Sequence, residues 1–314
     1  MSILVTGANG FVGKLLISDL LERKYDVVGA LRSQGSVNTS VKMVAVGDIT
    51  AATDWSAALD AIDVVVHLAA RVHVMNDRAS DPLVEFRRVN VDGTLNLARQ
   101  AAIAGVRRFI FISSVKVNGE LTEASRPFTE ADAANPQDAY GVSKFEAEQG
   151  LLQIAQETGM EVVIIRPPLI YGVGVKANFA SMIRTVKRGI PLPLGAINNK
   201  RSFVYVGNLV SLMIRCIDHP RAANQVFLVS DGHDLSTTEL LCACAIALGV
   251  KSRLLPVPQK LIEISATLVG KGDIAQRLCG NLQVDITKAR RLLDWEPRFS
   301  VSDSLKMSLL AYKK

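Results

Sequence analysis

The chain has 314 residues, more than a single hydrophobic core usually serves, so two lobes are expected. Hydrophobic residues make up 49% of the chain and charged residues 21%, which excludes a disordered, collagen-like or low-complexity protein. The net charge is only +6 and the sequence has no dense run of Lys or Arg. This balance favours an acidic small molecule as ligand and argues against nucleic acid as a partner.

Short β-branched runs alternate with longer helical patterns through the first half of the chain. Strands are predicted at residues 3–5, 27–28, 43–46, 64–66, 109–112 and 162–165, and helices at 11–23, 54–61, 82–104 and 140–158. The strands are apolar on both faces, which indicates a parallel sheet covered by helices on each side. Because crossovers are right-handed, the predicted fold class is α/β, with a Rossmann-type doubly wound parallel sheet.

The pattern changes after Arg166, where Pro167 and Pro168 end the sixth strand. Helices are then predicted at 178–188, 207–218, 236–249 and 302–312, a strand at 225–229 and an extended segment at 190–195. We predict a first domain of residues 1–168, to which residues 202–230 return. Residues 169–201 and 231–314 would form a smaller, mixed α/β substrate-binding lobe.

Cysteine content and hydropathy bear on the cellular setting. Cys216, Cys242, Cys244 and Cys279 are too few and too irregularly spaced for a disulfide framework, and none has a histidine at metal-ligand spacing. The longest apolar run, residues 240–250, is far shorter than the roughly 20 residues of a membrane span. The first residues lead straight into a strand pattern without a signal sequence. We therefore expect a cytoplasmic protein with no metal and no membrane partner.

Three glycines follow the first strand at spacing GxxGxxG, namely Gly7, Gly10 and Gly13. A tight strand-to-helix turn can bring backbone N–H groups against a pyrophosphate, and side chains at these positions would block that approach. The helix N-terminus adds a favourable partial charge. The loop opens an amphipathic helix, so it predicts a dinucleotide site rather than a simple turn.

The end of the second predicted strand bears on the choice of dinucleotide. NAD enzymes commonly place an acidic residue there for the ribose 2′-hydroxyl, whereas this chain has Leu31 followed by Arg32. A guanidinium pairs well with a 2′-phosphate. The sequence therefore predicts a preference for NADP(H), with NAD(H) possible if Arg32 is only a solvated side chain.

Tyr140 and Lys144 lie at i and i+4 of a predicted helix, so their side chains share one face. A free phenol has a pKa of about 10 and is a poor acid–base catalyst at neutral pH. A nearby ammonium group favours the phenolate and lowers that pKa. The pair predicts a catalytic tyrosine that Lys144 assists.

With these motifs the chain resembles the short-chain dehydrogenase/reductase superfamily, and within it the extended branch of nucleotide-sugar epimerases, dehydratases and reductases. The resemblance covers nearly the whole chain and is strongest over residues 1–210. It implies that the first domain binds a dinucleotide and that the smaller lobe binds a nucleotide sugar. The implied cofactor contacts are Gly7, Asn9, Gly10, Phe11, Val12, Gly13, Asp48, Ile49, Leu68, Ala69, Ala70, Asn90, Tyr140, Lys144 and Pro167.

The resemblance also implies substrate contacts. Ser114 matches the serine or threonine that hydrogen-bonds the substrate oxygen, and Ser113 is expected beside it. Arg201 matches the arginine that binds the diphosphate of the nucleotide sugar. The remaining candidates are Asn178 and Leu192 around the base and diphosphate, Arg277 as a second phosphate ligand, and Arg71 or His73 facing the hexose. For Arg277, Arg71 and His73 a solvated surface position is the open alternative.

The residues after Ser114 argue against one subfamily, the nucleotide-sugar dehydratases. The related dehydratases have Asp-Glu after the residue that matches Ser114, whereas this chain has Val115 and Lys116. A valine cannot donate a proton, so dehydration is excluded. The leading hypothesis is NAD(P)H-dependent reduction of the C4 ketone of a UDP-4-keto-6-deoxy-N-acetylhexosamine, for lipopolysaccharide or other surface-polysaccharide precursors.

Three other functions stay open. The first is a UDP-hexose 4-epimerase, acting on UDP-glucose or UDP-N-acetylglucosamine, that retains NAD through each turnover. The second is a hydroxysteroid- or flavonoid-type reductase of the same superfamily. The third is a non-catalytic cofactor-binding scaffold, which the presence of Ser114, Tyr140 and Lys144 disfavours. The family also predicts a homodimer in which helices 90–104 and 140–158 pair across a two-fold axis.

Overall fold

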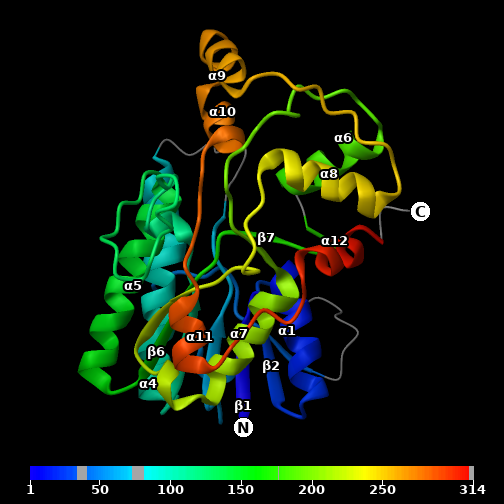
Figure 1. Cartoon of the computed structure of the whole chain (residues 1–314). Coiled ribbons are helices and arrows are strands. Elements are labelled where there is room, and N and C mark those ends of the chain that lie inside the picture. The colour runs from blue at the N-terminus through cyan, green and yellow to red at the C-terminus, as the bar shows by residue number, and fades with distance from the viewer. Residues whose placement is uncertain (34–40, 73–80, 176, 311–314) are drawn as a thin grey trace.

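A computed structural model describes residues 1–33, 41–72, 81–175 and 177–310. Its centre is a seven-stranded parallel sheet in the order β3-β2-β1-β4-β5-β6-β9 (Figure 1). The strands are β1 (Ser2–Thr6), β2 (Asp26–Leu31), β3 (Lys42–Ala45), β4 (Val64–His67), β5 (Arg108–Ile112), β6 (Glu161–Arg166) and β9 (Gln225–Leu228). This is the doubly wound α/β sheet that the sequence predicts.

Helices cover both faces of the sheet because successive strand residues point to opposite sides. In β1, Ile3 and Val5 join the cluster beneath α1 (Phe11–Glu22) and α7 (Val206–Asp218). Leu4, between them, joins the opposite cluster beneath α4 (Thr94–Ile103) and α5 (Ala139–Thr158). The short α2 (Ser56–Leu59) lies on this second face and α11 (Thr287–Leu293) on the first.

The helical pattern predicted for residues 82–104 is interrupted by a change of helix type. It begins as α3 (Pro82–Arg87), with the Asp81 side chain accepting hydrogen bonds from the N–H groups of Leu83 and Val84. A π-helical turn (Arg88–Gly93) then leads into α4. The sequence does not predict this turn, which brings Gly93 so close to Ile49 that a Cβ there would overlap its side chain.

The smaller lobe is built around a two-stranded parallel sheet of β7 (Leu169–Tyr171) and β8 (Phe203–Tyr205). Its core includes Tyr171, Tyr205 and Leu241. The helices of this part are α6 (Ala177–Lys187), α8 (Thr237–Leu248), α9 (Gln259–Leu268), α10 (Gly272–Cys279) and α12 (Val301–Leu309). β9 joins the large sheet beside β6, whereas β7 and β8 form a sheet of their own.

Several elements of this half differ from the sequence prediction. The strands β7 and β8 and the helices α9, α10 and α11 were not expected, and the last helix begins at Val301 and ends at Leu309. In the described part of the chain, every helix is too short or too polar to cross a membrane.

Candidate functional site

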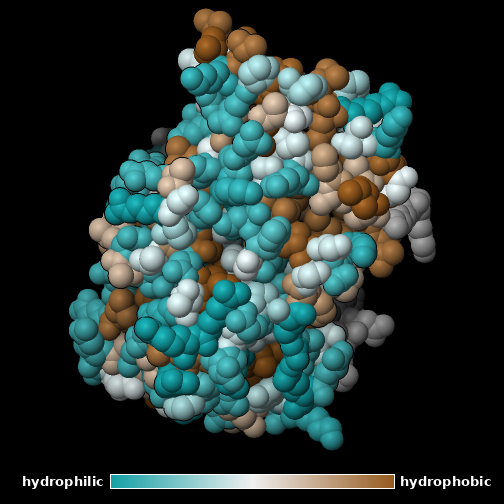
Figure 2. All heavy atoms as spheres, in the orientation of Figure 1, coloured by the Kyte–Doolittle hydropathy of each residue, from teal (hydrophilic) through white to brown (hydrophobic). Residues whose placement is uncertain are grey.

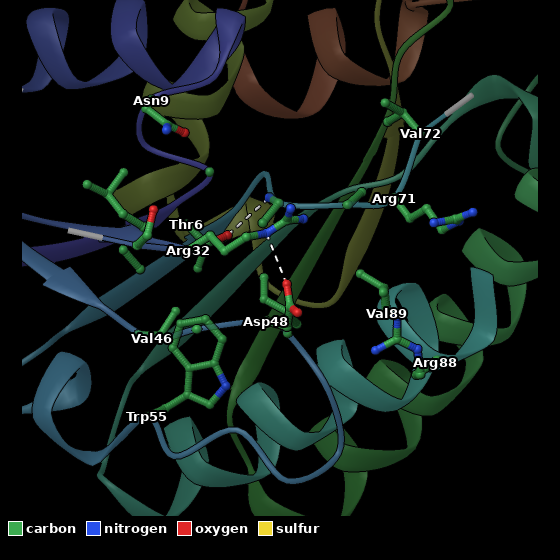
Figure 3. Close-up of a pocket in the computed structure, with 18 residues that line it drawn as sticks. Thr6, Asn9, Arg32, Val46, Asp48, Trp55, Arg71, Val72, Arg88 and Val89 are labelled. Atoms are coloured by element: carbon green, nitrogen blue, oxygen red, sulfur yellow. Dashed lines mark hydrogen bonds and ion pairs between the residues drawn. The ribbon is translucent and has the colours of Figure 1, made fainter. Parts of the chain in front are cut away.

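A cleft of about 610 Å³ opens at the carboxyl ends of β1 to β4 (Figure 3). The strand order reverses between β1 and β4, which is where open α/β sheets bind their ligands. Of the predicted site residues, those that line the cleft are Gly7, Asn9, Arg32, Asp48, Ile49, Ala69, Ala70 and Arg71. The sheet therefore brings together residues from four separate turns.

The glycine loop leaves no room for side chains. Gly7 has φ +65°, and a Cβ there would lie 3.1 Å from the Ala69 nitrogen. A Cβ on Gly13 would overlap the carbonyl oxygen of Gly7. α1 begins after Gly10, which offers no capping side chain, so the first N–H groups of the helix remain available to an anionic ligand. These features fit a dinucleotide pyrophosphate.

Phe11 and Val12 follow the loop at the start of α1. Their half-buried side chains pack against the core of the smaller lobe. A Cβ on Gly172, which follows β7, would lie 3.1 Å from the Phe11 ring. Phe11 and Val12 therefore join the two lobes through their side chains, so the predicted cofactor contact falls to their backbone.

Arg32 does not stand alone at the end of β2. Its Nε lies 3.0 Å from Oδ1 of Asp48, and both side chains are largely exposed (84% and 68%) at the rim of the cleft. Figure 3 shows the pair pointing toward each other. A carboxylate here disfavours a 2′-phosphate, because the two anions would repel each other. The pairing thus weakens the sequence argument for NADP(H).

The turn after β4 is held by buried polar side chains. Thr6 Oγ1 accepts hydrogen bonds from the N–H groups of Leu68 and Ala69, at 3.1 Å each. Its own hydrogen therefore goes to His67 Nδ1 at 2.8 Å, which leaves Nε2–H of His67 to donate to Thr94 Oγ1 at 3.0 Å. Burial, with a smaller effect of Lys144, lowers the pKa of His67 to about 3, so this ring is neutral.

Asn90 acts on the same turn from the π-helical segment. Its side chain accepts from the Arg71 N–H (2.8 Å) and donates to the Arg71 carbonyl (3.0 Å) and to Ser143 Oγ (3.0 Å). The predicted cofactor contact is therefore a fully buried residue that positions the wall of the cleft. The Arg71 guanidinium lies 5.5 Å from the Phe86 ring centroid.

Tyr140 and Lys144 lie in the first turns of α5, which Asp138 caps by accepting from the Gly141 N–H at 2.7 Å. Lys144 Nζ donates to the Ile112 carbonyl at 2.8 Å and lies 6.0 Å from the Tyr140 ring centroid. Burial lowers the pKa of Lys144 to about 7, although the Glu148 charge opposes this shift. Burial and the Asp138 charge raise the pKa of Tyr140.

Ser113 is placed differently from the sequence expectation of a substrate contact. It is buried, and its hydroxyl donates to Glu148 Oε1. Arg166 donates to the same carboxylate through Nε (3.0 Å) and Nη2 (2.6 Å), and to Asn118 Oδ1 through Nη1 (3.0 Å). Ser113 thus belongs to a buried ion-pair network behind Lys144, which the sequence analysis missed. The i, i+4 spacing of Lys144 and Glu148 is the signal that could have found it.

Ser114, the other predicted substrate contact, follows the end of β5. It is half-buried and begins a 3₁₀ turn (Val115–Val117), where its Oγ accepts from the Lys116 N–H at 3.3 Å. The Val115 N–H donates to the Pro167 carbonyl at 3.0 Å, which fixes this turn to the end of β6. Lys116 pairs with Asp138 and, at 3.2 Å, with Glu120.

The predicted substrate residues of the smaller lobe are less concentrated. Arg201 donates through Nη1 to the Gly280 carbonyl at 3.0 Å, and burial lowers the pKa of its guanidinium. Arg277 is exposed on α10, which ends just before Gly280. Leu192 exchanges backbone hydrogen bonds with Arg253 and Leu255 and packs toward the core of the lobe rather than the cleft. His73 and the side chain of Asn178 lie outside the described residues.

Fold and site together define a dinucleotide-dependent short-chain dehydrogenase/reductase. More narrowly, the chain belongs to the NAD dependent epimerase/dehydratase family, which its residues 3–230 match.

The chain is 51% identical to a UDP-glucose 4-epimerase of Vibrio cholerae over 313 residues, covering 99% of this chain and 95% of that protein. It is 31% identical to a 3-beta-hydroxysteroid dehydrogenase of Mycolicibacterium neoaurum, covering 99% and 91%. Among solved structures it resembles the UDP-glucose 4-epimerase of Thermotoga maritima with UDP-glucose, at a TM-score of 0.79 and 25% identity, covering 100% and 99%.

Proposed function

We propose that the protein is a UDP-hexose 4-epimerase that retains NAD. The observation that carries this proposal is the 51% identity, along 99% of the chain, to a UDP-glucose 4-epimerase. It favours the epimerase over the 4-ketoreductase that the sequence analysis placed first. The Arg32–Asp48 ion pair supports the same choice, because it pairs the Arg32 guanidinium with a carboxylate that would repel a 2′-phosphate.

The reaction would proceed at C4 of the hexose. NAD, held by the turns after β1 to β4 that line the cleft, would supply reversible hydride transfer at this carbon. Tyr140 takes the proton from the C4 hydroxyl and gives it back, and Ser114 hydrogen-bonds the same oxygen. Lys144, whose Nζ lies 6.0 Å from the Tyr140 ring, stabilises the phenolate when charged. Because burial and Asp138 raise the pKa of Tyr140, this stabilisation is needed near neutral pH.

Arg201 would hold the diphosphate of the substrate. Its guanidinium is half-buried and bonded to the Gly280 carbonyl, so the fork is oriented before a ligand arrives. Arg277, exposed one turn before Gly280, would add a second contact. The bound diphosphate leaves the hexose free to turn, which an epimerase requires between removal and return of the hydride.

The test begins with the purified protein. Denaturation should release NAD at close to one molecule per chain, and the native enzyme should interconvert UDP-glucose with UDP-galactose, or the N-acetyl pair, without added cofactor. Tyr140→Phe should retain the NAD and lose the interconversion. Purified protein that releases no NAD and leaves both pairs of sugars unchanged would refute the proposal.

A 4-ketoreductase is the second candidate, and one observation favours it. The end of β2 has Leu31 and Arg32 rather than an acidic residue, and both line the cleft. A reductase must exchange its cofactor at each turnover, so it would need added reduced cofactor. Arg32 would make NADPH the preferred one. Stoichiometric loss of reduced nicotinamide with a UDP-4-keto-6-deoxy-N-acetylhexosamine would establish this function and would place the protein in surface-polysaccharide synthesis.

A cytoplasmic homodimer remains part of the proposal. The helices that pair across its two-fold axis would be α4 and α5. Ala98 and Ala101 of α4 are fully buried within the subunit, so another face of α4 would form the interface. Ile103, at the end of α4, is 87% exposed and is free to take part. Light scattering tests the dimer, and a monomer across the working concentration range would refute it.

A further inference from the structure

The helical hairpin of α9 and α10 projects from the top of the molecule (Figure 1). Every residue of α9 is at least partly exposed, and α9 packs chiefly against α10. The outer face of α9 carries Leu261, Ile264 and Leu268 at i, i+3 and i+7, which places them in one stripe. Their exposed fractions are 57%, 58% and 81%, and Val269 adds 66% at the tip. Figure 2 shows the hydrophobic colouring gathered there.

Basic side chains outnumber acidic ones in the hairpin and in the segment just before it. Between residues 251 and 280 the sequence has five basic residues and two acidic ones. Lys260 lies in the first turn of α9 and Lys271 in the turn between α9 and α10, and both are exposed. Of the two acidic residues, Glu263 is half-buried and accepts a hydrogen bond from Gln259, and Asp273 is exposed at the start of α10. An apolar stripe flanked by lysines is the pattern of helices that lie in the interface of an anionic bilayer.

We propose that the α9–α10 hairpin docks the protein on the surface of an anionic phospholipid bilayer. The lysines contact the headgroups, and the stripe enters the boundary between headgroups and acyl chains. The sequence predicts no membrane partner because it has no apolar run long enough to span a bilayer. That argument does not bear on surface contact, which needs no spanning helix. A protein partner fits less well: four apolar side chains on a convex tip fall far short of the about 20–30 residues that a stable interface uses on each side.

The position of the hairpin gives the docking a consequence for the site. α10 ends at Cys279, and the next carbonyl, of Gly280, accepts the hydrogen bond from Arg201. A docked hairpin therefore places the predicted diphosphate-binding arginine close to the bilayer. The inference does not depend on which sugar the enzyme uses, and vesicle binding is measured without turnover.

The experiment is cosedimentation of the full protein with vesicles. We expect binding to vesicles of phosphatidylcholine and phosphatidylglycerol in equal parts, weaker binding in high salt, and little binding to phosphatidylcholine alone. The variant Leu261→Ser/Ile264→Ser/Leu268→Ser should lose binding by about tenfold or more, since each side chain loses several buried methylene groups. Lys260→Glu/Lys271→Glu should remove the preference for the anionic lipid.

A matched control carries the same chemistry elsewhere. Ile246 on α8 and Leu310 at the end of α12 are 78% and 59% exposed, so Ile246→Ser/Leu310→Ser removes comparable apolar surface and should bind vesicles as the wild type does. The three substitutions in α9 are at exposed positions and should leave the activity on soluble substrate unchanged. Absence of wild-type binding, equal binding by the α9 variant, or self-association that this variant abolishes would overturn the proposal.

Discussion

Arg166→Met should be the most destabilising single substitution of the buried network behind Lys144. The Glu148 side chain is 1% exposed and receives three hydrogen bonds from Arg166 and Ser113 within 3.0 Å, with a longer one of 3.2 Å from Arg166 Nε. Removing the guanidinium leaves the carboxylate buried with only a hydroxyl donor. Breaking one partner of such a pair costs about 3–5 kcal/mol of the free energy of unfolding.

The double variant Glu148→Met/Arg166→Met separates the pair from its parts. It removes both charges and leaves the Ser113 hydroxyl and Asn118 Oδ1 without these partners, at a cost of about 1–3 kcal/mol for each buried group that is left unsatisfied. It also removes the Glu148 charge that favours the charged form of Lys144. The double variant should therefore be no less stable than Arg166→Met alone. Urea unfolding of the three proteins measures the difference. If Arg166→Met unfolds within about 1 kcal/mol of the wild type, the buried charge is not held as we describe.

Three further predictions concern the candidate site. Tyr140→Phe should lower kcat by about 10²–10⁴-fold through loss of the proton transfer. It should leave the NAD content unchanged, since the ring and the other predicted cofactor contacts remain; parallel loss of NAD would contradict this. Gly13→Ala should reduce the dinucleotide released on denaturation by about tenfold or more, because the new Cβ overlaps the Gly7 carbonyl; full retention would show that the loop can relax. Burial lowers the pKa of Lys144 to about 7, below its unfolded value of about 10.4, so the unfolded chain binds more protons in between. The free energy of unfolding should therefore rise from about pH 7 to pH 9.5, by at most about 1.4 kcal/mol per pH unit. Urea unfolding of Lys144→Met should show a flatter rise, and an unchanged slope would exclude Lys144 as its source.

The large sheet could be predicted because its signals are local. Each buried strand is an apolar run, and β1 shows why: Leu4 and its neighbours Ile3 and Val5 enter opposite cores, so no polar residue interrupts the pattern. β7 and β8 have only three residues each, and each is a strand because of the other. Such pairing depends on residues distant in sequence, which the local pattern does not contain.

The candidate site residues also fall partly in motifs that are local in sequence. The glycine loop and the Tyr140–Lys144 pair are each defined within a few residues. Both lie on elements that pack against the large sheet. The interpretation of Arg32 depended on what faces it, and Asp48 comes from a different turn. Ser113 and Ser114 look alike in sequence, but the Ser113 N–H extends the ladder to Ile165 and its side chain turns inward.

The π-helical turn between α3 and α4 gives one continuous helix two different faces. Before the turn, the Phe86 ring meets the Tyr140 ring edge-on, with 5.9 Å between the ring centroids. After the turn, Leu97 and Ala101 pack on the large sheet. At 3.6 residues per turn, one residue fewer would rotate one half of the helix against the other by roughly 100°. A deletion of one residue between Arg88 and Gly93 would thus move Phe86 away from Tyr140. It would do so without changing any predicted cofactor- or substrate-binding residue outside this turn. The rotation of α3 relative to α4 therefore affects the candidate site, although it is set by a turn in which Asn90 is the only predicted cofactor contact.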